Sequence, residues 1–210
     1  RFSFSVGDLN GATASNVVTA DVDFSRAGAR DVLAVRMGIR SGLNQGARTS
    51  MRELDFHSVR GQLHYTRMLD FLDSRLTTRI MLQKTDKPLL AVEKLPIGGV
   101  RTVRGYRENL MVRDNGLAVG LDWSLPVPLA SGQPLNLGIS ADWGSSWDQD
   151  SNLPTHDKTH ISSLGFSVEW EPLKNLQLRF AYAYGFDKLP REEEDLQDKG
   201  FHFSLIYSLL

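Results

Sequence analysis

The chain has 210 residues, a formal net charge of -1, 41% hydrophobic residues and no cysteine, a composition typical of one domain with a large buried surface. The near-neutral, evenly scattered charge argues against an electrostatic nucleic-acid binder, and the lack of cysteine excludes disulfide frameworks and thiolate metal sites. No run of about 20 apolar residues is present, so the sequence offers no candidate for a membrane-spanning helix.

Hydrophobic residues recur with a period of two along most of the chain, which predicts β-strands rather than helices. In the stretch from Leu176 to Phe186, leucine, phenylalanine and tyrosine alternate with glutamine, arginine, alanine and glycine. We expect about ten strands, in chain order at residues 1–7, 17–24, 32–39, 59–69, 75–83, 117–125, 135–144, 164–170, 176–186 and 201–209.

The two faces of these strands differ in composition. One face carries large apolar and aromatic side chains, with Trp123, Trp143 and Trp170 near strand ends, and the other carries mostly small or polar residues. A soluble sandwich would pack its large apolar faces together in a dry core. This composition instead fits a lipid-facing band with interfacial aromatics around a water-filled interior. We therefore predict an all-β antiparallel meander that forms part of a transmembrane β-barrel.

The expected connections alternate between long and short. Short connections are expected near residues 25–30, 70–74 and 171–175, medium ones near 8–16 and 126–134, and long ones near 41–53, 85–114, 145–160 and 187–199. Bacterial outer-membrane barrels have short periplasmic turns and long outer loops. The longest connection, about 85–114, is therefore expected on the outer side.

That connection contains IGGVRTVRGYRENLMVRDNG, residues 97–116, which resembles the lid-loop signature of the two-partner secretion translocators, the haemolysin secretion/activation proteins. The tetrad Val103–Tyr106 is typical of a superfamily that also contains the barrel-assembly insertase. The extension through Arg107, Glu108, Asn109 and 112–116 is similar to the secretion branch. ADWGSSW, residues 141–147, resembles the family's strand motif, in which an inward Asp142 and the following Gly144 precede an aromatic residue.

The resemblance implies that the long loop folds back into the lumen as a lid, and a hairpin there needs glycines where backbone passes close to the wall. Its motif residues are Gly98, Gly99, Val103, Arg104, Gly105 and Tyr106. Arg104 is expected to form a bidentate pair with Asp142 on the barrel wall, next to Gly144. The alternatives are a solvated Arg104, an Asp142 that only ends a strand, and a Tyr106 that is only an interfacial aromatic. Alternation also places Asp122, Glu169 and Arg179 on the lumen face, without individual functions.

The last strand has a glycine followed by alternating large residues, at Gly200, Phe203, Leu205 and Tyr207. This pattern resembles the signal read by the barrel-assembly machinery, and the alternative is simply a lipid-facing strand. Full-length relatives are expected to have about sixteen strands and upstream periplasmic domains. We therefore expect residues 1–210 to be the C-terminal portion of the barrel domain, with a free edge at residues 1–8 and no secretion activity when isolated.

Three functions remain open from the sequence. The first is an outer-membrane pore of a Gram-negative bacterium that exports a large adhesin- or haemolysin-like exoprotein, with outer-membrane lipid, lipopolysaccharide and the barrel-assembly machinery as further partners. The second is a barrel-assembly insertase. The third is an outer-membrane hydrolase, which would need His156 or another histidine near an outer carboxylate. His156 and His160 are spaced for a metal clamp, but the polar context after Pro154 favours a solvated loop. We expect no catalytic residues, metal or cofactor.

Overall fold

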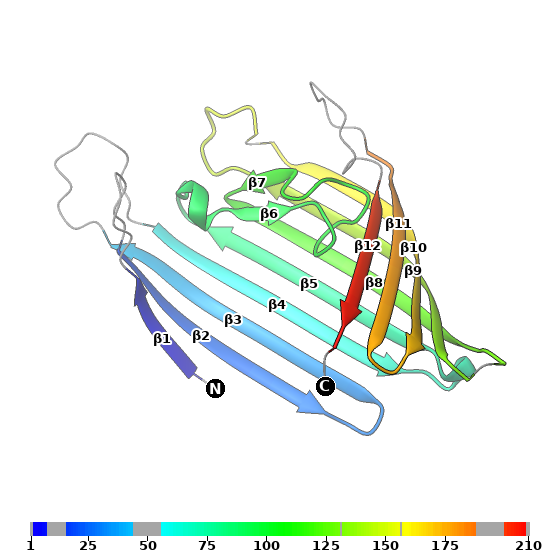
Figure 1. The fold of residues 1–210 in the computed structure, drawn as a ribbon. Coiled ribbons are helices and arrows are strands. Elements are labelled where there is room, and N and C mark those ends of the chain that lie inside the picture. Colours follow the sequence, from blue (N-terminus) through cyan, green and yellow to red (C-terminus); the bar gives the residue numbers. More distant parts are fainter. Residues whose placement is uncertain are drawn as a thin grey trace.

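The structure, a computed structural model, describes residues 2–7, 16–43, 56–130, 132–155, 157–187 and 200–208. Its main element is an antiparallel ten-stranded sheet in the order β1-β2-β3-β4-β5-β8-β9-β10-β11-β12, which confirms the predicted meander. Strands β1 and β12 lie at the two edges of this sheet, so the curved sheet is open (Figure 1). The strands are β1 (Phe2–Gly7), β2 (Asn16–Ala27), β3 (Asp31–Leu43), β4 (Phe56–Met68), β5 (Arg75–Thr85), β8 (Asn115–Pro128), β9 (Pro134–Trp147), β10 (Thr159–Leu173), β11 (Leu176–Gly185) and β12 (Phe201–Tyr207).

Short and long connections alternate along the sheet, as the sequence predicts. The short ones are the turns between β2 and β3, β4 and β5, β8 and β9, and β10 and β11, and the β4–β5 turn contains the 3-10 helix η1 (Phe71–Asp73). In the β2–β3 turn the Gly28 amide donates to the Asp31 carbonyl at 2.7 Å, which closes the hairpin. The longest connection joins β5 to β8, at the ends of the strands opposite to the short turns.

One face of the sheet carries the large apolar residues and is here called the outer face. Within the described residues, no second layer covers it. Phe24, Ile39, Phe166 and Phe203 are 54%, 60%, 45% and 69% exposed. A soluble protein rarely exposes a continuous apolar surface of this extent, whereas a barrel wall presents one to lipid. The expectation of a lipid-type exterior therefore fits the structure better than a soluble sandwich. Among the helices of the described residues, none is long and apolar enough to cross a bilayer.

The opposite, inner face holds the only packed core found in the described part of the chain. The β5–β8 connection forms the 3-10 helix η2 (Ala91–Glu93) and a hairpin of β6 (Leu95–Ile97) and β7 (Met111–Arg113). Figure 1 shows this hairpin against the sheet, near β8 and β9. The core cluster consists of loop residues and wall residues together: Leu95, Ile97, Val103, Tyr106, Met111, Ala118 and Ile161.

Candidate functional site

The candidate site is the contact between the β5–β8 connection (residues 86–114, here called the inserted loop) and the inner face of the sheet. Three glycines shape the loop: Gly98, Gly99 and Gly105 have φ angles of +119°, +94° and +85°, a region that side chains disfavour. Gly105 also passes close to the wall. A Cβ atom there would stand 2.9 Å from the Ala183 carbonyl oxygen and 3.0 Å from the Gly185 nitrogen.

Small residues on the wall receive large residues of the loop. Val103 is fully buried, and a Cβ atom at Gly144 would lie 2.9 Å from the Cγ2 atom of Val103 and 2.7 Å from that of Ile97. A Cβ atom at Gly185 would lie 2.6 Å from the Tyr106 ring. Glycine at Gly144 and Gly185 therefore makes room for the loop, because the Cβ atom of any larger residue would overlap the side chains of Ile97, Val103 or Tyr106.

Arg104 lies at the centre of the contact. Its Nε donates to Asp142 Oδ2 at 2.6 Å and its Nη2 to Asp142 Oδ1 at 2.7 Å, so the pair is bidentate. The Arg104 amide adds a third bond to Asp142 Oδ2 at 3.1 Å. The two side chains are only 6% and 1% exposed. The alternatives of a solvated arginine and of an aspartate that merely ends its strand are therefore wrong.

Two further charged residues complete this group, here called the tip cluster (Arg79, Arg104, Asp122 and Asp142). Asp122 accepts a bond from Arg104 Nη1. Arg79 Nη2 lies 3.1 Å from Asp122 Oδ2 and 3.4 Å from Asp142 Oδ1. The register explains how Arg79 reaches β9: Gly120 stands between Arg79 and Asp142, and a Cβ atom at Gly120 would lie 2.9 Å from Arg79 Nη2. Two cations and two carboxylates thus balance: Arg104 and Asp142 are buried, and the partly exposed Arg79 and Asp122, at 25% and 27% side-chain exposure, neutralise them.

Tyr106 anchors the loop to β10 and to the segment after β11. Its hydroxyl donates to the Ser162 carbonyl oxygen at 2.9 Å and accepts from the Asp187 amide at 2.9 Å. The side chain is 4% exposed, so the alternative of an interfacial aromatic is wrong for this residue.

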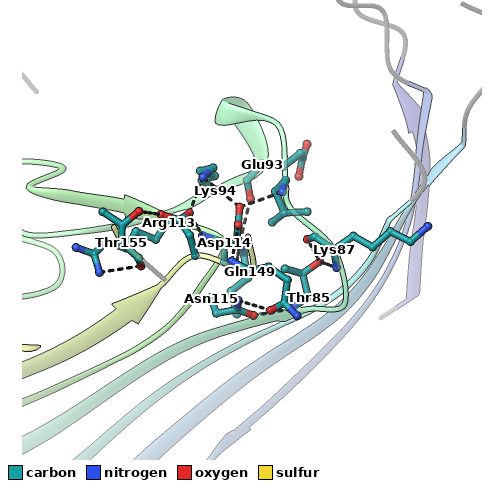
Figure 2. A network of polar contacts seen from close by, with 12 residues as sticks. Thr85, Lys87, Glu93, Lys94, Arg113, Asp114, Asn115, Gln149 and Thr155 are labelled. Atoms are coloured by element: carbon teal, nitrogen blue, oxygen red, sulfur yellow. Dashed lines mark hydrogen bonds and ion pairs between the residues drawn. The ribbon is translucent and has the colours of Figure 1, made fainter. Parts of the chain in front are cut away.

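The base of the inserted loop carries a second ionic group, here called the root cluster (Lys94, Asp114 and Asp148). Lys94 Nζ lies 2.6 Å from Asp148 Oδ1 and 3.2 Å from Asp114 Oδ1. Figure 2 shows Lys94 and Asp114 within a wider network that reaches Gln149 and Thr155 of the β9–β10 connection. Asp114 has no exposed surface, and its carboxylate also accepts the amides of Leu89 and Gln149.

Two residues of the root cluster, Lys94 and Asp148, have pKa values shifted by their surroundings. Burial alone would lower the pKa of Lys94, but its bonds to Asp148 and Asp114 raise that pKa above its ordinary value. Burial alone would raise the pKa of Asp148, but hydrogen bonds from Lys94 and Thr155 lower it below the ordinary value of a carboxyl group. Both shifts favour the charged forms, so the root is an ion pair at neutral pH.

The neighbouring Glu93 attaches the loop base to strands β3, β4 and β5. Its carboxylate accepts from Arg40 of β3 at 2.6 Å and from Arg60 of β4 at 3.3 Å. The Glu93 carbonyl oxygen accepts from Gln83 of β5 at 3.0 Å. Consecutive residues Glu93 and Lys94 therefore connect the loop base to strands β3 to β5 and to the β9–β10 connection.

Among the other residues expected from the sequence, Gly200 lies next to the inserted loop, since a Cβ atom there would stand 3.3 Å from Gly105 Cα. Glu169 and Arg179 face each other across β10 and β11, and Glu169 accepts a bond from Gln177 rather than from the loop. Phe203, Leu205 and Tyr207 are exposed on the last strand. Gly200 has a φ of +68° and lies against the Ala183 carbonyl.

The histidine pair considered for metal binding is only partly described. His156 lies outside the described residues, and the His160 side chain is 67% exposed. Across the residues that the structure describes, no group of three or more histidine, aspartate or glutamate residues could hold a metal ion.

Sequence reasoning missed Arg79, Glu93, Lys94, Asp114 and Asp148 as participants. Period-two alternation could have placed Arg79 on the same face as Gln83, but no local pattern indicates which partner an inward arginine selects. The charged residues of the root lie in connections, where alternation gives no face at all.

The open meander, its lipid-type exterior and a long loop folded onto the inner face define a section of an outer-membrane β-barrel. The chain belongs to the haemolysin secretion/activation protein family ShlB/FhaC/HecB, whose family model matches residues 11–171. This confirms the resemblance to two-partner secretion translocators. The family is one of outer-membrane transporters of Gram-negative bacteria and not of enzymes.

Two solved structures share the fold. CdiB from Escherichia coli has a TM-score of 0.71 at 13% sequence identity, and the match covers 91% of this chain and 36% of that one. CdiB from Acinetobacter baumannii has a TM-score of 0.68 at 19% identity, with 92% and 34% covered. The chain thus spans about a third of the length of these structures. The comparison with curated proteins gave no match.

Proposed function

We propose that this chain forms part of the wall and the lid of an outer-membrane pore that exports a large exoprotein of the adhesin or haemolysin type. The observation that carries the proposal is the buried bidentate contact between Arg104 of the inserted loop and Asp142 of β9. A loop held on the inner face by a balanced ionic group obstructs the pore, and it can be released without breaking any strand pairing. Family membership supports secretion over barrel insertion.

The lid has two attachments with different properties. The tip is held by the four side chains of the tip cluster, by the Arg104 amide and by the Tyr106 hydroxyl. The root is fixed by the root cluster, by Glu93 and by several backbone groups. Arg113 adds bonds at 3.0 Å to the Ser146 carbonyl oxygen and at 2.9 Å to the Thr159 hydroxyl. We infer that opening moves the tip while the root stays in place, because the tip has fewer interactions to break.

A cysteine pair can test whether the tip must move. The Cγ2 atom of Val103 lies 2.9 Å from the position of a Cβ at Gly144, so Val103→Cys with Gly144→Cys brings two sulfurs within disulfide reach. All cysteine variants are made in an Ile97→Ala background, because the Ile97 Cγ2 atom would otherwise lie 2.7 Å from the new Cβ. The chain has no cysteine of its own. In the full-length transporter, the oxidised double variant is expected to stop secretion of the exoprotein, and a reductant is expected to restore it.

The single variants Val103→Cys and Gly144→Cys are the matched controls, since they carry the same side-chain changes without the crosslink. Secretion at the wild-type rate by a fully oxidised double variant would rule out displacement of the tip during transport. Loss of secretion in the single variants would instead indicate a packing defect. Only a block caused by the disulfide is relieved by a reductant, so recovery on reduction distinguishes the block from the packing defect.

A further inference from the structure

Two lysines contact one tryptophan at the end of the sheet that carries the long connections. Lys84 Nζ lies 5.3 Å from the centroid of the Trp147 ring, and Lys158 Nζ lies 4.8 Å from the same centroid. The three residues come from the end of β5, the end of β9 and the segment just before β10. This group, here called the rim site, belongs to neither the tip cluster nor the root cluster.

The register places the rim site on the outer face. Lys84 follows the exposed Leu82 by two residues along β5, and Trp147 follows the exposed Trp143 by four along β9. Residues two or four apart in a strand lie on the same face. Thr159 pairs with Ser146 across β9 and β10, so Lys158 stands next to Trp147. Both lysines are exposed.

The charges of the rim site are not neutralised by the protein in the part of the chain that the structure describes. No salt bridge there joins Lys84 or Lys158 to a carboxylate; each has only its contact with the indole ring. Asn115 lies between Lys84 and Trp147 in the register, and its amide is occupied by bonds to the Thr85 amide and the Gln149 side chain. Two ammonium groups held near one ring repel each other, and an anion between them would remove that repulsion.

The position of the rim site indicates which anion this is. Long connections of an outer-membrane barrel lie on the outer side, and tryptophan on the lipid face concentrates at the membrane boundary. The residues that follow it on the outer face include the polar Ser145, His160 and Ser162. They also include the apolar Leu82, Trp143 and Leu164, here called the apolar strip, which are 39%, 41% and 55% exposed. Ammonium groups above an apolar strip match a lipid that has a phosphate on its headgroup and acyl chains below.

We propose that Lys84, Trp147 and Lys158 bind the phosphate of a phosphorylated glycolipid of the lipid A type in the outer leaflet. The two ammonium groups contact the phosphate as point charges, the indole orients them, and the acyl chains lie along the apolar strip. The proposal rests on the outer-membrane location in the proposed function, but not on the lid or on the identity of the exported protein.

The test uses the full-length transporter purified in detergent and titrated with bis-phosphorylated lipid A, with thermal unfolding as the readout, because a ligand that binds only the folded state raises its melting temperature. Lys84→Gln/Lys158→Gln is expected to weaken binding by about tenfold or more, because each lysine attracts an anionic membrane lipid. Lys84→Arg/Lys158→Arg is expected to retain binding. Lys174→Gln, at the exposed turn between β10 and β11, is the matched control and is expected to behave as the wild type.

Titrations with two further ligands test whether the lipid or the phosphate group alone is bound. Dephosphorylated lipid A and inorganic phosphate alone are each expected to leave the melting temperature unchanged. A wild-type response in the glutamine double variant would overturn the proposal, and so would an equal response to inorganic phosphate. Secretion by the Lys84→Gln/Lys158→Gln variant is measured separately, so a failure of the rim site is distinguishable from a failure of the lid.

Discussion

The sharpest prediction concerns removal of the Arg104 side chain. Arg104→Ala leaves Asp142, which is 1% exposed, with only the Arg104 amide at 3.1 Å and Arg79 at 3.4 Å. Breaking a buried ion pair by removing one partner costs about 3–5 kcal/mol. Because Arg79 still neutralises part of the charge, we expect the lower end, about 3 kcal/mol. Every 1.4 kcal/mol is a factor of ten, so the ratio of released to docked tip should rise by roughly a hundredfold.

Single-channel recording of the full-length transporter in a planar bilayer measures that ratio as the time spent in the open state. The matched control is Arg101→Ala, because Arg101 is exposed in the same loop and contacts Arg79 through its carbonyl oxygen, which the substitution keeps. A variant that combines Arg104→Ala with Asp142→Ala should lose less than the two single effects added, since the buried carboxylate is then gone too. An unchanged open-state population in Arg104→Ala, or an equal change in Arg101→Ala, would refute the reasoning.

Three other changes test the packing and the charges of the inserted loop. Gly144→Val should undock the tip, because its Cβ alone would lie 2.7 Å from a loop methyl group; faster limited proteolysis of the loop checks this, and Ala141→Val on the outer face is the control. Tyr106→Phe removes two hydrogen bonds of 2.9 Å and keeps the ring. At about 1 kcal/mol for each net hydrogen bond, it should speed amide exchange in the loop by about thirtyfold; no change would exclude an anchoring role for the hydroxyl. The lowered pKa of Asp148 predicts that its stabilising effect is complete above the ordinary carboxyl pKa of about 3.9 and is lost as the pH falls through the lowered value. Amide exchange at the loop base should therefore accelerate in acid, and Asp148→Asn should flatten this pH dependence. An unchanged pH dependence in Asp148→Asn would show that Asp148 does not stabilise the loop base.

The strand pattern is the part of the fold that could be predicted from the sequence. In a strand, successive side chains point to opposite faces, so the alternation around Asp122 and Asp142 assigns both residues to the inner face without knowledge of their neighbours. The alternation of short and long connections likewise depends only on where the pattern stops. The resemblance at residues 97–116 added the expected direction of the inserted loop and the pairing of Arg104 with Asp142.

Local periodicity alone is enough to indicate an antiparallel meander, its lipid-type face and the residues that point inward. Three sets of contacts come from the folded arrangement instead. Arg79 and Asp122 join Arg104, Glu93 and Lys94 attach the loop base to separate parts of the sheet, and Lys84 and Lys158 meet at Trp147. These contacts join residues far apart in the sequence. A charge finds its partner through the register of several strands and the path of a loop, and no local pattern carries that information.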